Sequence, residues 1–98
     1  MNDGLHFEWD ENKNISNQEK HGVSFEEAKS VFSDVLGRLI SDPDHSENEE
    51  RFILMGMSSQ LRLLIVCHCE RCSNLIRIIS DRKADRFERK QYEEKNYA

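Results

Sequence analysis

The sequence has little that is typical of a membrane protein or a disulfide-rich domain. It contains one proline, four glycines and three cysteines among 98 residues. No apolar stretch approaches the roughly 20 residues of a membrane-spanning helix. The cysteines are odd in number and all lie within Cys67–Cys72, which does not suit a disulfide framework. The segment Met1–Gly4 lacks the basic and apolar regions of a secretory signal. We therefore expect a single domain over residues 1–98 in a reducing, cytoplasmic setting.

The charge is unevenly distributed along the chain. The net charge is −5, which by itself disfavours a nucleic-acid partner. Residues 1–50 hold four lysines and arginines against thirteen acidic residues, a net charge of −9. Residues 51–98 hold ten against six, a net charge of +4. Such a distribution is compatible with a basic face on an acidic body.

The patterning predicts an α+β fold with an antiparallel meander. Asp10 and Ser24 are suitable N-caps for two helices, the second as a capping box closed by Glu27, and Gly22 is suited to end the first helix. In the first helix Ile15 is almost the only residue available to a core, and in the last one Ala84, Phe87 and Gln91 form a thin stripe beside Tyr92. The proline-containing segment Asp42–His45 indicates a turn. The predicted strands are His6–Trp9, Leu36–Ile40, Arg51–Met57, Leu61–Cys69 and Leu75–Ile79, and the predicted helices are Glu11–Lys20, a helix from Ser24 to about Phe32, and about Arg82–Lys95.

The junction Arg77–Ala84 is a candidate anion site. It gathers Arg77, Arg82 and Lys83 where the last strand is expected to lead into the last helix. Ser80 or Asp81 would cap that helix, so free backbone N–H groups and cations would meet at one place. Phosphate is the obvious biological anion. The alternative is a solvated helix terminus, although Arg77 interrupts an apolar strand and needs a partner or an open groove.

Other polar residues support weaker hypotheses. His21 and His45 suit acid–base chemistry, but a histidine at a helix end or in a turn is more often simply exposed. The segment Cys67–Cys72 offers one C-x-x-C spacing and no second pair, so small apolar cysteines are favoured over a zinc site. No Gly-rich phosphate loop and no serine–histidine–aspartate pattern is present.

The chain resembles BrnT, the ribonuclease toxin family of BrnT/BrnA toxin–antitoxin modules, whose fold is similar to RelE. The resemblance runs from Phe7 to Tyr92 in order. It rests on Phe7-Glu8-Trp9-Asp10, Asn17, Lys20-His21-Gly22-Val23-Ser24-Phe25-Glu26-Glu27-Ala28, Val31-Phe32, His45-Ser46, Glu50-Arg51, Met55-Gly56-Met57-Ser58, Arg77-Ile78-Ile79-Ser80-x-Arg82-Lys83-Ala84, Glu88 and Tyr92.

The resemblance implies a cytoplasmic endoribonuclease that needs no metal or other cofactor. It implies neutralisation by a BrnA-like antitoxin with a ribbon-helix-helix domain, and contact with operator DNA only through that antitoxin. Asp81 stands where the family commonly has alanine, and we expect this anion among the cations to weaken RNA binding.

Metal-free RNA cleavage needs cations around the phosphate and groups that transfer protons. We assign phosphate stabilisation to Arg77, Arg82 and Arg51. His45 is the first acid–base candidate, with His21 and Tyr92 behind it. Lys83, Lys20 and Tyr92 are candidate RNA contacts, and Glu88 is expected to position arginines.

Two alternatives belong to other functional classes. The chain could be a toxin-like binding module without catalysis that acts only in a regulatory complex with its antitoxin, as the acidic amino-terminal half suggests. It could also be a zinc-stabilised binding domain. Cleavage of RNA in excess chelator, or metal analysis of the purified protein, separates these possibilities from the nuclease.

Overall fold

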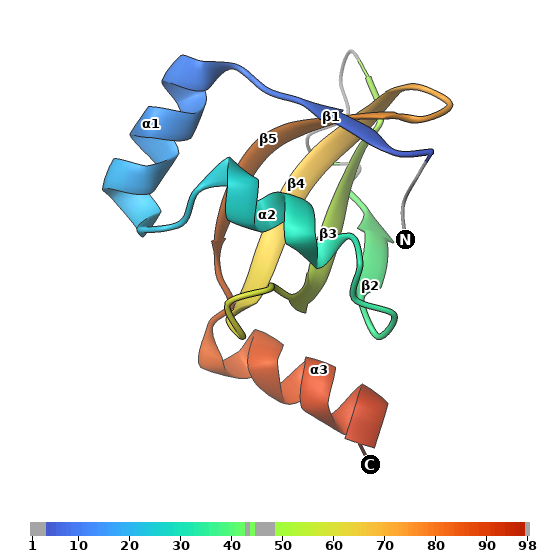
Figure 1. Cartoon of the computed structure of the whole chain (residues 1–98). Coiled ribbons are helices and arrows are strands. Elements are labelled where there is room, and N and C mark those ends of the chain that lie inside the picture. Colours follow the sequence, from blue (N-terminus) through green and yellow to red (C-terminus); the bar gives the residue numbers. More distant parts are fainter. Residues whose placement is uncertain (1–3, 43, 45–48, 98) are drawn as a thin grey trace.

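The protein is built on a five-stranded sheet with strand order β1-β5-β4-β3-β2 (Figure 1). The computed structural model describes residues 4–42, 44 and 49–97. Pro43 and His45, two of the four residues of the predicted turn Asp42–His45, lie outside the described residues. The strands are β1 (His6–Glu8), β2 (Arg38–Ser41), β3 (Arg51–Met57), β4 (Leu63–Cys72) and β5 (Leu75–Lys83), and the helices are α1 (Glu11–His21), α2 (Phe25–Val31) and α3 (Arg86–Tyr97).

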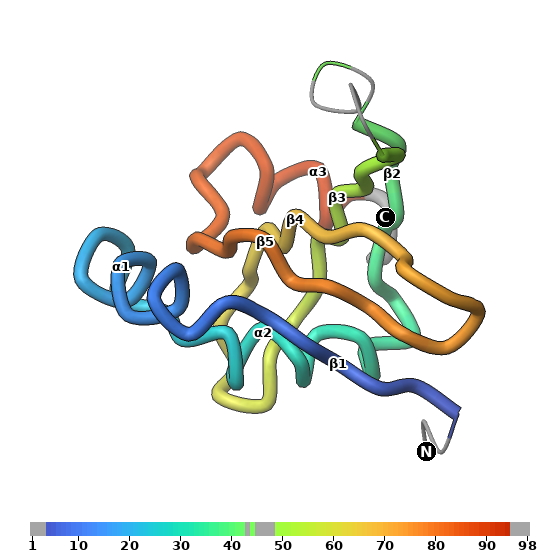
Figure 2. Tube along the Cα trace, turned by 90° about the horizontal axis from the view of Figure 1, so that it is seen from above, coloured from blue at the N-terminus to red at the C-terminus, as the bar shows by residue number. Residues whose placement is uncertain are grey.

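The sheet confirms the predicted α+β class. Strands β2 to β5 form an antiparallel meander, and β1 pairs in parallel with the first part of β5 at the sheet edge. Seen from above, α2 and α3 lie on opposite sides of the central strands (Figure 2). One core cluster packs α2 against one face of the sheet, through Phe25, Ala28 and Val31. The other cluster places Tyr92 of α3 against Met55, Leu63 and Ile65 on the opposite face. No helix of the described part is long and apolar enough to cross a membrane.

The helix termini follow the predicted capping residues. The Asp10 carboxylate accepts hydrogen bonds from the backbone N–H groups of the first turn of α1, and Gly22 ends this helix with a φ of 72°. Ser24 Oγ accepts from the Glu27 N–H at 3.0 Å. The reciprocal half of the predicted capping box is wrong, because the Glu27 carboxylate instead binds Arg62 and Ser58.

Helix α1 is attached to α2 and to the segment before it through polar side chains. Ile15, the expected core residue, is 48% exposed, whereas Asn14 and Asn17 are buried. The Asn14 side-chain oxygen accepts from the Phe25 N–H at 2.9 Å, and Asn17 Nδ2 donates to the Val23 carbonyl at 3.0 Å. Hydrogen bonds from side-chain amides therefore hold this helix in place, whereas most amphipathic helices are held by an apolar stripe.

The largest departure from the sequence prediction is at the carboxyl-terminal end of the sheet. Strand β5 continues to Lys83 and α3 begins only at Arg86, so Arg82 and Lys83 belong to a strand and not to the first turn of a helix. The predicted helix cap at Ser80 or Asp81 is wrong for the same reason. The pairing of β4 with β5 also shifts register between Cys67 and His68, which leaves Ile79 as an extra residue, a β-bulge.

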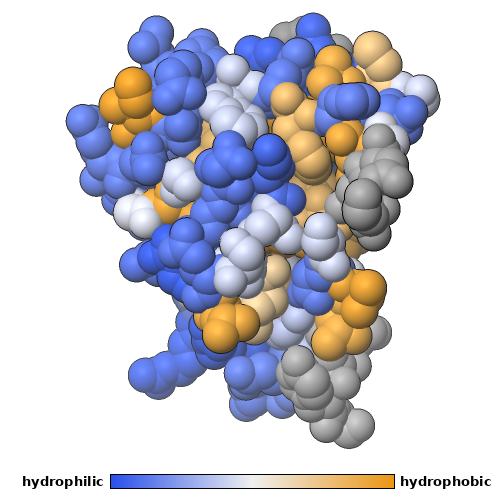
Figure 3. Space-filling view, viewed as in Figure 1, coloured by the Kyte–Doolittle hydropathy of each residue, from blue (hydrophilic) through white to orange (hydrophobic). Residues whose placement is uncertain are grey.

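Helix α3 packs on the sheet through Tyr92, and its Glu88 forms an ion pair with Arg82 of β5. Tyr92 is 2% exposed, and its hydroxyl donates to the Asp34 carboxylate at 2.6 Å. Phe87, expected on the buried stripe, is 69% exposed. Several hydrophobic residues of the described chain are exposed in the same way, and the face in Figure 3 mixes a largely hydrophilic surface with separate hydrophobic patches.

Candidate functional site

A hollow of about 290 Å³ lies beside α3 on the face of the sheet that α1 and α2 do not cover. Arg51 from β3, Cys67 from β4 and Ser80 and Arg82 from β5 line it, together with His21 from the end of α1. Ile53, Ile65 and Ile79 form its apolar floor, and Asp42 and Asp81 complete the lining. Three of the predicted site residues, Arg51, Arg82 and His21, are therefore brought together here.

The strand register explains why these side chains share one face. Residues directly opposite in a sheet point to the same side. Ile53 pairs with Cys67 and Cys67 with Ser80, while Ile65 pairs with Arg82. Because Ile65 contacts the α3 cluster, this whole set lies on the α3 side of the sheet. The bulge at Ile79 places Ser80 and Arg82 on this side, since side chains alternate along a strand.

Arg82 is held in a defined orientation by α3. Its Nη1 and Nη2 atoms donate to the two carboxylate oxygens of Glu88, each at 2.8 Å. Nη1 also reaches the Lys83 carbonyl at 3.3 Å. The hydrogen bonds that Arg82 donates to Glu88 raise the pKa of Arg82, and the same contact lowers the pKa of Glu88. A guanidinium has five N–H donors, so this pairing leaves N–H groups for an anion in the hollow.

Arg51 brings a second positive charge to the hollow. Its carbonyl accepts a hydrogen bond from the Asp42 N–H at 2.9 Å, which fixes the start of β3 against the end of β2. Burial raises the pKa of the neighbouring Cys67 thiol, and the charge of Arg51 opposes that change. Cys67 is therefore a neutral thiol near physiological pH, and it contributes shape to the hollow without contributing charge.

His21 is the only described histidine that lines the hollow. It ends α1 and is exposed. His68 lies on the opposite face of the sheet, where its ring packs edge-on to Phe32 with centroids 4.8 Å apart. Burial lowers the pKa of His68, which keeps this ring neutral. His45 lies outside the described residues, so its position relative to the hollow is not part of this geometry.

The other predicted site residues lie elsewhere. Arg77 does not converge with Arg82: it is next to Glu8 in the sheet, and its Nη1 donates to that carboxylate at 3.0 Å. Lys83 pairs with Leu64, so its side chain points to the face of the sheet on which α2 packs, opposite the hollow. Tyr92 belongs to α3 and is buried against the sheet. Lys20 lies at a second hollow beside α1, which shares lining residues with the first.

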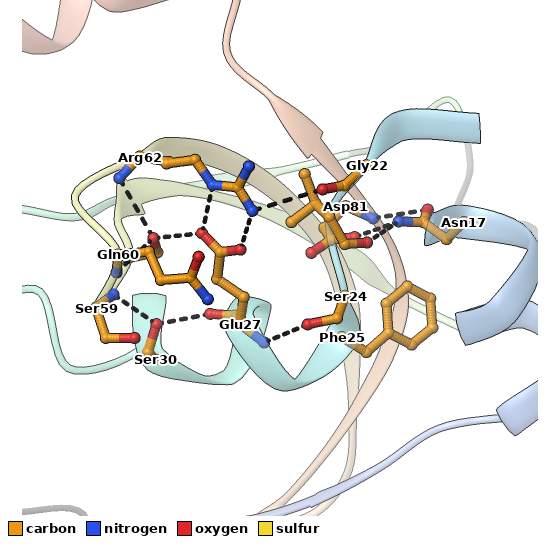
Figure 4. A network of polar contacts seen from close by, with 12 residues as sticks. Asn17, Gly22, Ser24, Phe25, Glu27, Ser30, Ser59, Gln60, Arg62 and Asp81 are labelled. Carbon is orange, nitrogen blue, oxygen red and sulfur yellow. Dashed lines mark hydrogen bonds and ion pairs between the residues drawn. The ribbon is translucent and has the colours of Figure 1, made fainter. Parts of the chain in front are cut away.

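Asp81 forms part of a polar network behind the hollow (Figure 4). Asn17 Nδ2 donates to Asp81 Oδ1, and the Asp81 N–H donates to Asn17 Oδ1 at 3.2 Å. Asp81 is 1% exposed, and its Oδ2 has no hydrogen-bond partner among the described residues. Burial raises the pKa of Asp81 to about 7. Asp81 therefore lies among the residues that line the hollow, but its carboxylate is bonded to Asn17 of α1, and the expected weakening of RNA binding by this residue stays a prediction.

The rest of this network fixes the two helices to the loop between β3 and β4. Arg62 Nε donates to Glu27 at 3.0 Å, and Arg62 Nη2 makes a second contact with the same carboxylate. The hydroxyl of Ser58 donates to Glu27 at 2.6 Å. The hydrogen bond from Arg62 lowers the pKa of Glu27, which therefore stays ionised although it is buried. These contacts hold α2, and with it the end of α1, at a fixed position relative to β4 and β5.

The cysteine segment does not form a metal site in the described structure. Cys67 and Cys69 point to one face and His68 to the other, as the strand alternation predicted. Within residues 4–42, 44 and 49–97, no group of three histidine, cysteine or acidic side chains is placed to hold a metal ion. Cys69 is buried, as expected for a small apolar residue, whereas Cys72 is exposed.

Sequence reasoning missed Ser80 and Cys67 as lining residues. Both follow consecutive apolar residues, 63–66 in β4 and 78–79 in β5, so no polar–apolar alternation along these strands marks them as lining residues. The pairing of β3, β4 and β5 that joins them into one row is a tertiary feature. No single segment of the sequence indicates this pairing.

Comparisons with known proteins place the chain in a class of bacterial toxins. The fold matches the crystal structure of the Brucella abortus ribonuclease toxin BrnT with a TM-score of 0.66 and 23% identity, over 84% of this chain and 99% of that one. Residues 9–88 match the family model described as the ribonuclease toxin, BrnT, of type II toxin-antitoxin systems. The chain therefore belongs to the BrnT family. No curated protein sequence matches it.

Proposed function

We propose that the chain is a metal-independent endoribonuclease that cleaves cytoplasmic RNA in the hollow formed by Arg51, Arg82 and His21. The observation that carries this proposal is the meeting of two arginines and a histidine from three separate elements at one hollow. Membership of a family of ribonuclease toxins supports the same reaction.

In this reaction the 2′-hydroxyl of one nucleotide attacks the adjacent phosphorus. A new P–O bond forms to the 2′-oxygen, the bond to the 5′-oxygen of the next nucleotide breaks, and a 2′,3′-cyclic phosphate remains. Negative charge grows on the phosphoryl oxygens during the attack, and preorganised cations lower that barrier. Arg82 and Arg51 supply these cations, and arginine suits the task because its planar fork matches phosphate oxygens.

Proton transfer is the second requirement. His21 takes the proton of the 2′-hydroxyl or returns one to the leaving 5′-oxygen, and an imidazole suits either task near neutral pH. His45 is the candidate for the complementary role. Glu88 acts on Arg82 and does not itself move a proton, because its carboxylate is taken up by the guanidinium.

The test is cleavage of RNA by the purified protein in excess chelator. Arg82→Lys keeps the charge beside Glu88 and removes the fork, and we expect roughly a hundredfold loss of kcat or more. His21→Ala should cost a comparable factor. Arg89→Lys is the matched control, since Arg89 lies on α3 next to Glu88, does not line the hollow, and pairs with Glu93 at 3.8 Å. Full cleavage by a folded Arg51→Ala/Arg82→Lys double variant would exclude this assignment.

We further propose that the partner is a BrnA-like antitoxin with a ribbon-helix-helix domain, through which the complex reaches operator DNA. The family's place in type II toxin–antitoxin systems supports a protein antitoxin. Co-expression with the product of an adjacent short reading frame should yield a stable complex that no longer cleaves RNA. A complex that cleaves as fast as the free chain would contradict the proposal.

A catalytically silent binding module is the second candidate. Two arginines of the sheet, Arg77 and Arg82, are both engaged by carboxylates, at 3.0 and 2.8 Å. Ion pairing of this kind reduces the charge available to a phosphate. The cleavage assay decides between the candidates, because a binding module leaves RNA intact at every protein concentration while it still binds its antitoxin.

A further inference from the structure

A second hollow, of about 480 Å³, lies between α1 and the outer part of β5. We call it the α1 groove. It shares His21, Ile79 and Ser80 with the candidate active site, so the two hollows lie side by side. Lys13, Ser16 and Lys20 line it from α1. Apart from His21 at its inner end, the groove lining has no role in the chemistry described above.

The helix side of the groove is a regular polar stripe. Lys13, Ser16, Asn17 and Lys20 follow the i, i+3, i+4, i+7 spacing that places residues on one face of a helix. This spacing normally carries apolar residues against a sheet. Here Asn17 alone is buried, and Lys13, Ser16 and Lys20 stay exposed along the groove. Lys13 and Lys20 are seven residues apart, which separates them by ~10 Å along the helix axis.

The groove is also fixed in position. The Asn17 side chain bonds to both the backbone and the carboxylate of Asp81 in β5, so α1 cannot slide relative to the strand without breaking these contacts. The groove lining has two lysines and a histidine against one carboxylate, Glu19. In a chain with a net charge of −5, such a local excess of cations suits an anionic ligand.

We propose that the α1 groove binds the phosphate backbone of a nucleotide that flanks the cleaved linkage, with Lys13 as the outermost contact. The inference rests on the proposed function, because it extends the path of the same RNA strand. The strand passes from the hollow over Ser80 and along α1, where Lys20 and then Lys13 meet successive phosphates. Lysine suits this role, since contacts to the backbone position a strand without reading its bases.

The test measures equilibrium binding of a fluorescent 2′-O-methyl octanucleotide, which cannot be cleaved because its 2′-hydroxyls are blocked. Lys13→Gln should weaken binding roughly fivefold, the upper end for an exposed charged contact. Glu19→Gln, in the same groove, should tighten it. Lys29→Gln is the matched control: Lys29 belongs to α2 and pairs with Glu26 at 3.2 Å, and its loss should leave the affinity unchanged.

The salt dependence gives a second readout. Each phosphate contact on a single strand contributes about −0.7 to the slope of log K against log salt. Lys13→Gln should therefore reduce that slope by about 0.7, and Lys29→Gln should not. Equal slopes for the two variants, or equal affinities for Lys13→Gln and Glu19→Gln, overturn the inference.

Failure of the proposed function has a different signature. A wild-type chain that leaves RNA intact, but binds the octanucleotide with the predicted dependence on Lys13 and Glu19, refutes cleavage and supports the groove. A chain that cleaves RNA equally well with and without Lys13, with unchanged octanucleotide binding, refutes the groove and supports cleavage. A Lys13→Gln variant that binds RNA normally but loses its antitoxin assigns the groove to protein and also refutes the inference.

Discussion

The buried carboxyl of Asp81 makes the stability of the fold depend on pH in an unusual direction. Its side chain is 1% exposed, and burial is the main cause of a pKa raised from 3.8 to about 7. Between these two values the folded chain holds a proton that the unfolded chain has released. Stability from this group therefore falls as pH rises through that window, at about 1.4 kcal/mol per pH unit.

The magnitude follows from the same numbers. The full shift corresponds to roughly 4 kcal/mol, and the part that falls between pH 5 and 7 is about 2 to 3 kcal/mol. Replacement by asparagine, Asp81→Asn, keeps an oxygen for the Asn17 amide and removes the ionisation. We expect the stability advantage of the variant over the wild type to grow by about 2 to 3 kcal/mol between pH 5 and pH 7 and to level off by pH 8.

Urea unfolding of both proteins at pH 5, 6, 7 and 8 measures this difference. Comparison with the variant cancels the contribution of His68, whose lowered pKa makes the folded state more stable as pH rises over part of the same range. Glu27, Asp34 and Glu88 have lowered pKa values and stay ionised above pH 5. A difference between the two proteins that does not change with pH would refute the reasoning.

Two further predictions concern the contacts that hold the helices. Arg62→Met should reduce the free energy of unfolding more than Glu27→Gln, because it leaves the carboxylate of Glu27 buried without its main partner. The double variant should recover part of the loss. Urea unfolding that ranks the two single variants the other way contradicts this prediction. Tyr92→Phe should cost about 1 kcal/mol through the lost bond to Asp34, and Tyr92→Ala about 3 to 5 kcal/mol with loss of helical circular dichroism as α3 detaches. An alanine variant that keeps its helicity and loses under 1 kcal/mol would show that α3 is held by other contacts.

Local signals predicted most of the elements. The caps at Asp10 and Ser24 and the stop at Gly22 each depend on a few neighbouring residues, and all three are confirmed. The apolar runs that became β3, β4 and the first part of β5 were also found, because burial on both faces leaves an unmistakable composition. These features need no knowledge of the rest of the chain.

The charged segment after Ile79 could not be predicted in the same way. Ser80-Asp81-Arg82-Lys83 has the composition of a helix start, with a capping residue followed by charges. It is a strand because Asp81 finds Asn17, which is 64 residues away, and because β4 offers pairing partners up to Lys83. Tertiary contacts overrode the local preference, and no pattern within the segment indicates them.

The same limit applies to the site. Arg51, Arg82 and His21 were named from their residue types, and the register brings them to one hollow. Arg77 and Lys83 were named on the same grounds, yet one lies beside Glu8 and the other on the opposite face. Which of these cations meet depends on which strands pair and on which face of the sheet each side chain of β5 points to. Neither follows from composition.

The bulge at Ile79 determines whether the cationic or the anionic side chains of β5 face the hollow. With Ile79 in a bulge, the positions after it present Ser80 and Arg82 to the hollow and direct Asp81 and Lys83 to the other side of the sheet, where Asp81 is buried and Lys83 is exposed. If Ile79 paired regularly with Cys67 instead of forming the bulge, the two pairs would exchange faces, so that a carboxylate would face the hollow and a guanidinium would be forced towards the apolar side. A change that alters no charged residue would thus be equivalent to a charge reversal in the binding surface.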